Sequence, residues 1–61
     1  MPNITDRELE TLQNLLGNEQ VLVKKYRFFA SSCTDPQLRV KFQQMAARHT
    51  DHFNRLLSYL N

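Results

Sequence analysis

The sequence predicts an all-α fold, an antiparallel hairpin of two helices that dimerises into a four-helix bundle. Two observations favour the hairpin. Along two segments, apolar residues recur at alternating spacings of three and four residues, which is the period of one helix face. Between the segments stands Pro36, which suits the first turn of a helix and not the interior of one. No stretch alternates apolar and polar residues as a half-buried strand does, so we expect no strand.

The first helix is expected over about residues 5–33. Its start carries the residues of a capping box, since the Thr5 hydroxyl can accept a hydrogen bond from the backbone of Glu8 and the Glu8 carboxylate can accept one in return. The apolar seam runs through Gly17 without a change of register, which favours one helix over two. One charged residue, Glu19, interrupts this seam. The seam and its flank are Leu9, Leu12, Leu16, Glu19, Val23, Tyr26, Ala30 and Cys33, widened by Leu15, Leu22 and Phe29.

The second helix is expected over about residues 36–60, after a turn at residues 34–35, either of which can serve as the N-cap. His49 and His52 interrupt its seam. The seam and its flank are Leu38, Phe42, Met45, His49, His52, Leu56 and Tyr59, widened by Ala46, Phe53 and Leu60. Two helices with such broad apolar faces leave part of each face uncovered, so we expect a homodimer of two hairpins.

The length and composition limit the class of protein. The chain of 61 residues, 41% hydrophobic and 23% charged, is expected to form one domain over residues 1–61. Domains shorter than roughly 70–80 residues rarely bury enough core unless a disulfide, a metal or a partner chain adds stability. Cys33 is the single cysteine, so an internal disulfide is excluded, and a free thiol favours a cytoplasmic setting. A metal ion or a second copy is therefore the expected source of added stability.

Membrane and nucleic-acid partners are not expected. The longest apolar runs span only a few residues, too short to cross a bilayer, and the chain does not open with the pattern of a secretory signal. The net charge of +2 is too small to indicate a nucleic-acid surface. Basic residues gather toward the turn and acidic residues at the start of the first helix, which favours a dimer with its turns at opposite ends. These residues are Lys24, Lys25, Arg27, Arg39 and Lys41, and Asp6, Glu8 and Glu10.

The three polar seam residues are predicted to lie in one layer. If the chain reverses at residues 34–35, the numbers of facing residues add up to about 69, which places Glu19 level with residue 50, between His49 and His52. The layer falls near the middle of both helices, so a twofold axis through it would bring its two copies together. Two imidazoles and a carboxylate are a common ligand set for Fe(II) and Zn(II). We therefore predict that Glu19, His49 and His52 bind iron or zinc.

Two other interpretations of this layer stay open. Buried polar groups must be paired, so a hydrogen-bonded layer that sets register and dimer specificity, without metal or catalysis, would also explain it. An oxidase or peroxidase would require open coordination positions and a substrate channel. No sequence feature indicates either of these, so no catalytic residue is assigned.

Three stretches of the chain together resemble the coat-F domain of spore coat proteins, which belongs to the wider ferritin-like group. They read LLGNE at residues 15–19, CTDPQLR at 33–39 and RHTDH at 48–52. The resemblance implies a ferritin-like four-helix bundle. It also implies spore coat components as partners and a place in the spore coat or forespore.

The resemblance also bears on the ligands. Ferritin-like di-iron proteins take a Glu from the first helix of each half and a Glu-x-x-His pair from the second. Glu19 matches the first of these positions and His52 matches the histidine, whereas His49 stands where the family has the Glu that bridges two irons. The resemblance therefore implies a single iron or zinc ion at each site in place of a di-iron centre.

Overall fold

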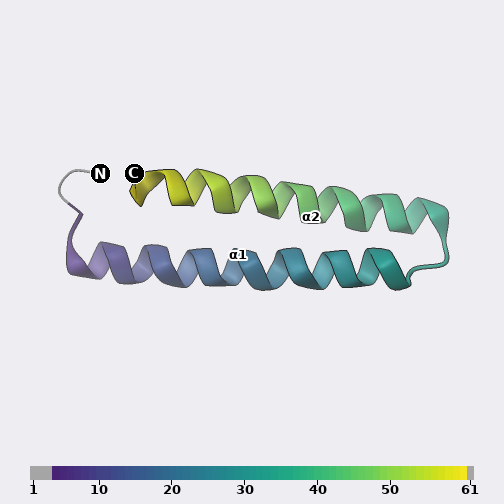
Figure 1. Cartoon of the computed structure of the whole chain (residues 1–61), viewed down its shortest axis with the longest axis horizontal. Helices are drawn as coiled ribbons and strands as arrows, with labels where there is room; N and C mark the ends of the chain where they lie inside the picture. Colours follow the sequence, from purple (N-terminus) through teal and green to yellow (C-terminus); the bar gives the residue numbers. More distant parts are fainter. Residues whose placement is uncertain (1–3, 61) are drawn as a thin grey trace.

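The computed structural model describes residues 4–60, which form an antiparallel pair of long helices (Figure 1). Helix α1 spans Asp6–Ser32 and helix α2 spans Pro36–Leu57, followed by a short 3-10 helix, η1, over Ser58–Leu60. No strand occurs among the described residues, and the predicted helical hairpin is confirmed. The start of α1 and the end of α2 lie together at what we call the open end, and residues 33–35 form the loop end.

The start of α1 forms the predicted capping box. The Glu8 backbone N–H donates to the Thr5 hydroxyl at 3.0 Å, and the Thr5 backbone N–H donates to Glu8 Oε1 at 3.0 Å. The hydrogen bond from the Thr5 backbone, and after it the contact with the Thr5 side chain, favours the charged carboxylate and lowers the pKa of Glu8. Helix α1 then continues through Gly17 without a break, as its seam predicts.

The loop end is held by two local sets of hydrogen bonds. Asp35 is the N-cap of α2, because its Oδ1 accepts hydrogen bonds from the backbone N–H groups of Gln37 at 2.9 Å and Leu38 at 3.2 Å. The Arg39 guanidinium donates to the Cys33 carbonyl through Nε at 3.2 Å and Nη2 at 2.7 Å. The Cys33 backbone is extended, with φ −81° and ψ 129°, so α1 ends just before this residue and not at it as the sequence predicts.

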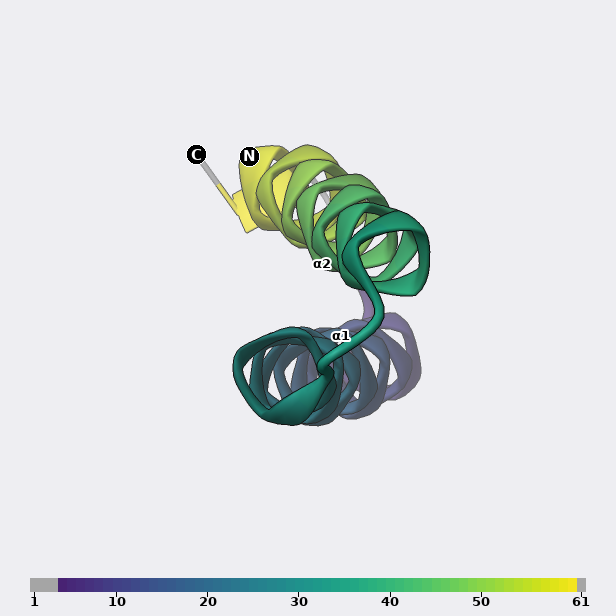
Figure 2. The same ribbon diagram turned by 90° about the vertical axis from the view of Figure 1, so that its right-hand side faces the viewer.

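The hairpin buries little of its apolar surface. Among the described residues only Leu12, Ala30 and Ala46 are buried hydrophobic side chains, and no large side chain is fully enclosed. Figure 2 shows the reason, because the two helices form a single layer with an open broad face on either side. The exposed large apolar side chains are Leu15, Val21, Phe28, Leu38, Val40, Leu57, Tyr59 and Leu60. Two helices alone therefore leave much of the seams and their flanks in contact with water.

The described part of the chain forms a narrow rod of 47 × 14 × 10 Å. Neither of its long helices is apolar enough to cross a membrane. At the open end the last turn is the 3-10 helix η1, so the α-helix ends at Leu57 and not at the predicted residue 60. Residues 1–3 and 61 of the expected domain lie outside the described residues.

Candidate metal centre

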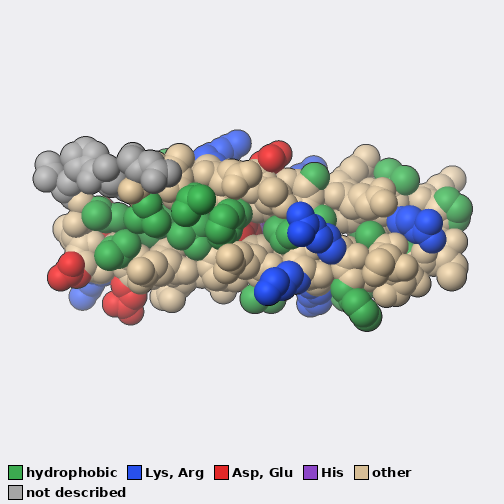
Figure 3. All heavy atoms as spheres, in the orientation of Figure 1, with side chains coloured by type: hydrophobic (Ala, Val, Ile, Leu, Met, Phe, Trp, Pro, Cys, Tyr) green, Lys and Arg blue, Asp and Glu red, His purple; other side chains and the backbone are tan. Residues whose placement is uncertain are grey.

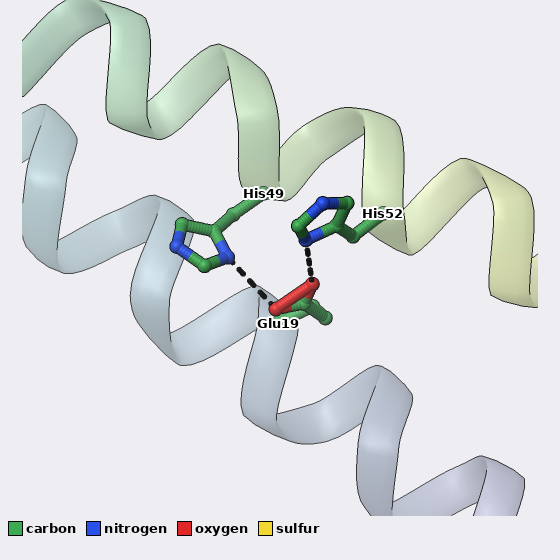
Figure 4. Close-up of side chains that lie close together, drawn as sticks. All are labelled: Glu19, His49 and His52. Atoms are coloured by element: carbon green, nitrogen blue, oxygen red, sulfur yellow. Dashed lines mark hydrogen bonds and ion pairs between the residues drawn. The ribbon is translucent and has the colours of Figure 1, made fainter.

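Glu19, His49 and His52 lie together between the helices near the middle of the hairpin (Figure 4). Glu19 comes from the middle of α1, and the two histidines come from α2, where a spacing of three residues places them on one face. His49 Nδ1 is 2.9 Å from Glu19 Oε1, and His52 Nδ1 is 3.1 Å from Glu19 Oε2. The predicted polar layer is therefore present, and we call these three residues the Glu–His–His centre.

The three side chains differ in their access to solvent. The Glu19 and His49 side chains are 13% and 16% exposed, whereas the His52 side chain is 43% exposed. The Tyr26 ring stacks on His49, with the ring planes 4° apart and the centroids separated by 5.7 Å. His52 meets the His49 ring edge-on, at 5.4 Å between centroids. The centre is thus closed around His49 and open at His52.

A shallow cleft lies beside the open side of the centre. Its volume is about 350 Å³, and its lining residues are Leu15, Asn18, Glu19, His52, Arg55 and Leu56. Glu19 and His52 both line it, so this side of the centre borders a cleft that is open to solvent.

The geometry identifies which atoms can share one ion. In Figure 4 the Nδ1 atoms of both rings point at the carboxylate, and the Nε2 atoms lie on the far sides of the rings. The two histidines and Glu19 each offer a ligand atom within 4.8 Å of the others. Two ligand atoms that are each about 2.1 Å from an ion lie roughly 3.0–3.4 Å apart in octahedral or tetrahedral geometry. The N···O distances of 2.9 and 3.1 Å, each to a different Glu19 oxygen, are close to that range, and all three residues offer ligand atoms within 4.8 Å. A small divalent ion could be held here if the side chains close slightly around it.

An ion bound at this centre would compete with protons. A neutral imidazole that carries its proton on Nδ1 donates a hydrogen bond to the facing Glu19 oxygen, and two such bonds occupy both oxygens. An ion bound at the same atoms displaces both protons. Among the residues that the structure describes, no buried side-chain nitrogen or oxygen lacks a partner. The centre is therefore satisfied as a hydrogen-bonded layer, and as a metal site it supplies three ligands and leaves further coordination positions open.

Two other seam residues lie in different settings. The stacking of Tyr26 on His49 is a feature that the sequence pattern does not predict, because the seam identifies Tyr26 only as an inward-facing aromatic residue. Cys33 is half-buried at the loop end, where its Sγ lies 3.6 Å from the Asp35 carbonyl oxygen. It belongs to the connection between the helices and not to the Glu–His–His centre.

Residues 15–19, 33–39 and 48–52 suggest kinship with the coat-F domain. Comparison of the chain with protein-family models, with curated proteins and with solved structures finds no match. The relation to the coat-F domain and to ferritin-like bundles thus stays a prediction from the sequence.

Proposed function

We propose that this chain is a small metal-binding protein of ferritin-like type, related to spore coat proteins. In this proposal the Glu–His–His centre of each copy binds one iron or zinc ion within a homodimeric four-helix bundle. The observation that carries the proposal is the convergence of three ligand atoms, from two helices, within 4.8 Å. Because the ligands come from both α1 and α2, a bound ion links the helices at their middle. Such a link adds stability to a chain that is too short for a large core.

The position of His52 supports a ligand role. A carboxylate that is largely shielded from water needs a partner, and His49 already supplies one at 2.9 Å from the closed side of the centre. His52 is far more exposed and can be hydrated without Glu19, so an exposed pair of this kind adds little stability by itself. A second imidazole that points at the same carboxylate from the solvent side is the arrangement that a chelate requires.

A second candidate is a purely structural assembly module without metal or catalysis. It is favoured by one specific observation, which is that each Glu19 oxygen already has an imidazole nitrogen within hydrogen-bonding distance. In this interpretation the layer fixes the register of α1 against α2 and the specificity of the dimer, as buried polar residues do in some helical assemblies.

The homodimer is supported by what the single hairpin leaves exposed. Most large apolar side chains of the seams and flanks are only partly covered. Four of them are exposed, namely Leu15, Leu38, Tyr59 and Leu60, and four further large apolar side chains outside the seams are exposed as well. A second hairpin would cover one broad face of the first and complete a four-helix bundle. Kinship with coat-F domains is supported by the residues at the turn and in the centre, and it would place coat components among the partners.

The experiment that tests the function is elemental analysis of tag-free protein of known concentration, before and after treatment with a chelator. We expect close to one iron or zinc ion per chain, and we expect His52→Ala to lose it. The matched control is Asp51→Asn, which removes an exposed carboxylate beside His52 in the sequence and leaves the centre intact.

Two outcomes would contradict the metal site. A folded dimer that contains no metal and takes up neither added Zn²⁺ nor added Fe²⁺ would favour the structural module. Metal retained by the triple variant Glu19→Ala, His49→Ala, His52→Ala would show that the ion is bound elsewhere.

A further inference from the structure

The hairpin has two broad faces with different surfaces. One face carries a hollow of about 730 Å³ toward the loop end, and we call it the hollow face. The hollow is lined by Arg27, Ala30, Ser31, Arg39, Gln43, Ala46, Ala47, Thr50 and Asp51. The other face carries the cleft beside the metal centre, and we call it the His52 face. On α2, residues i and i+2 lie on opposite faces, because they are about 200° apart around the helix axis.

The hollow face has an apolar half as well as a hollow half. Ala46, Thr50, Phe53 and Leu57 recur at spacings of four, three and four, so they lie on one flank of α2. The flank therefore begins with small residues in the hollow and ends with large apolar residues toward the open end, where Leu57 is exposed. Because the α-helix is right-handed and α2 runs from right to left in Figure 1, this flank faces the viewer in Figure 3. Figure 3 shows apolar side chains gathered over the open end and basic side chains over the middle and the loop end.

We propose that the hollow face is the surface on which two copies of this chain pack antiparallel, with their loop ends at opposite ends of the bundle. This inference rests on the homodimer proposed above. The twofold axis passes at the level of Glu19, which is the middle residue of α1, so that each α2 lies on the partner's α2. Phe53 then lies level with the partner's Ala47, and Leu57 lies level with the partner's Gln43. The large apolar side chains of one copy fill the hollow of the other, in both directions.

Charge favours this face in the antiparallel arrangement. Arg27, at the edge of the hollow, lies one residue from the level of the partner's Glu10, so basic and acidic groups meet at the rim of the interface. The flank of α2 on the His52 face instead carries a row of basic residues seven apart, Lys41, Arg48 and Arg55. The same packing over the His52 face would lay two such rows against each other. Like charges in contact disfavour that dimer.

The size of the face also suits a dimer. The rod measures 47 × 14 Å across its broad faces, a projected area of roughly 660 Å². A standard interface buries ~800 Å² of accessible surface per partner, so a dimer of that size would use nearly the whole face. The apolar flank and the hollow together run along most of this length.

The orientation has a consequence for the metal centres. With the hollow faces packed together, both His52 faces point outward, and each 350 Å³ cleft keeps its access to solvent. The two centres lie at the same level of the bundle but do not merge into one cluster of four histidines. Each binds its own ion and exchanges it through the outer face.

Disulfide trapping tests the face, in a Cys33→Ser background with diamide as the oxidant. Gln20→Cys and Thr50→Cys place a thiol near the twofold axis on the hollow face, and we expect each to form a disulfide-linked dimer on a non-reducing gel. Asn18→Cys and Arg48→Cys are matched controls, two residues away on the His52 face, and we expect them to stay unlinked. Circular dichroism checks that each variant is folded, and the linked Thr50→Cys dimer is expected to bind two Zn²⁺ ions.

The outcomes separate this inference from the proposed function. Linking of Asn18→Cys and Arg48→Cys in place of the other pair would overturn the choice of face. A dimer in sedimentation in which none of the four links would overturn the antiparallel orientation. A monomer at every concentration that still binds one Zn²⁺ per chain would refute the homodimer and leave the metal site standing.

Discussion

The Tyr26 ring lies parallel to the His49 imidazole, with the centroids 5.7 Å apart and the planes within 4°. In this stacked arrangement His49 Nδ1 lies 2.9 Å from Glu19 Oε1. Tyr26 stacks on His49 and not on His52, and His52 is the more exposed of the two histidines. Tyr26, which is not one of the three candidate ligands, therefore packs directly against the more enclosed histidine of the Glu–His–His centre.

Tyr26→Leu is expected to weaken Zn²⁺ binding about tenfold, because residues that orient metal ligands commonly contribute 10–100-fold to affinity. Tyr26→Phe keeps the ring and is expected to bind Zn²⁺ like the unmodified chain. Competition with a chromophoric chelator at neutral pH measures both affinities. If the Leu and Phe variants, equally helical by circular dichroism, bind Zn²⁺ equally well, stacking does not position His49.

The cap of α2 can be tested with neighbouring residues. Asp35 accepts two backbone hydrogen bonds at the start of α2, whereas Thr34 lies before the cap. Asp35→Ala is expected to lower the free energy of unfolding by about 1 kcal/mol, the usual cost of losing an N-cap side chain. Thr34→Ala is expected to change it by much less. Urea denaturation at one fixed protein concentration measures both changes. A larger loss of stability for Thr34→Ala than for Asp35→Ala would show that Asp35 is not the N-cap.

The capping box at Glu8 predicts a pH dependence of stability. The hydrogen bonds with Thr5 lower the pKa of Glu8 in the folded chain below its ordinary value of 4.5. The charged carboxylate therefore contributes stability above that pH, and this contribution is lost as the pH falls through the lower pKa of the folded state. Glu8→Gln can keep the geometry of the box but has no charge to lose. We expect a smaller drop in melting temperature between pH 7 and pH 3 for Glu8→Gln than for the control Glu10→Gln.

Gly17 offers a stabilising substitution. It lies inside α1, and an added Cβ would meet no atom within 4 Å. Gly17→Ala is expected to raise the free energy of unfolding by about 1 kcal/mol, because alanine loses less backbone entropy in a helix. Urea denaturation measures the gain, and a loss of stability would mean that another chain approaches α1 closely at this position.

The sequence predicts the hairpin and the meeting of the three polar residues for a physical reason. Heptad spacing fixes which side of each helix faces inward, and the position of the turn fixes which levels face each other. This rule places Glu19 level with residue 50, and Glu19 contacts His49 and His52 in the structure. The sequence does not decide between Thr34 and Asp35 as the N-cap of α2, because either side chain can accept the same backbone hydrogen bonds.

The contact of Tyr26 with His49 could not be predicted in the same way. The numbers of this pair add up to 75 and not to about 69, so their backbones are not level. Side chains on a helix lean toward its N-terminus, and in an antiparallel pair they lean in opposite directions. Tyr26 leans toward the open end and His49 toward the loop end, which brings the two rings together. The difference in exposure between His49 and His52 likewise depends on helix rotation, which spacing alone does not fix.

Removal of the metal distinguishes the two interpretations of the centre. If an ion joins α1 to α2, free Zn²⁺ at about 100 times its dissociation constant adds about 2.7 kcal/mol to the free energy of unfolding. Excess chelator is then expected to lower the melting temperature of the unmodified chain. The triple variant Glu19→Leu, His49→Leu, His52→Leu is expected to be insensitive to chelator. It is also expected to be at least as stable as the metal-free chain, because apolar residues replace a polar layer that costs desolvation. If chelator leaves the unmodified chain unchanged while it remains a folded dimer, the layer acts only through its hydrogen bonds, and the search for function moves to the partners of the bundle.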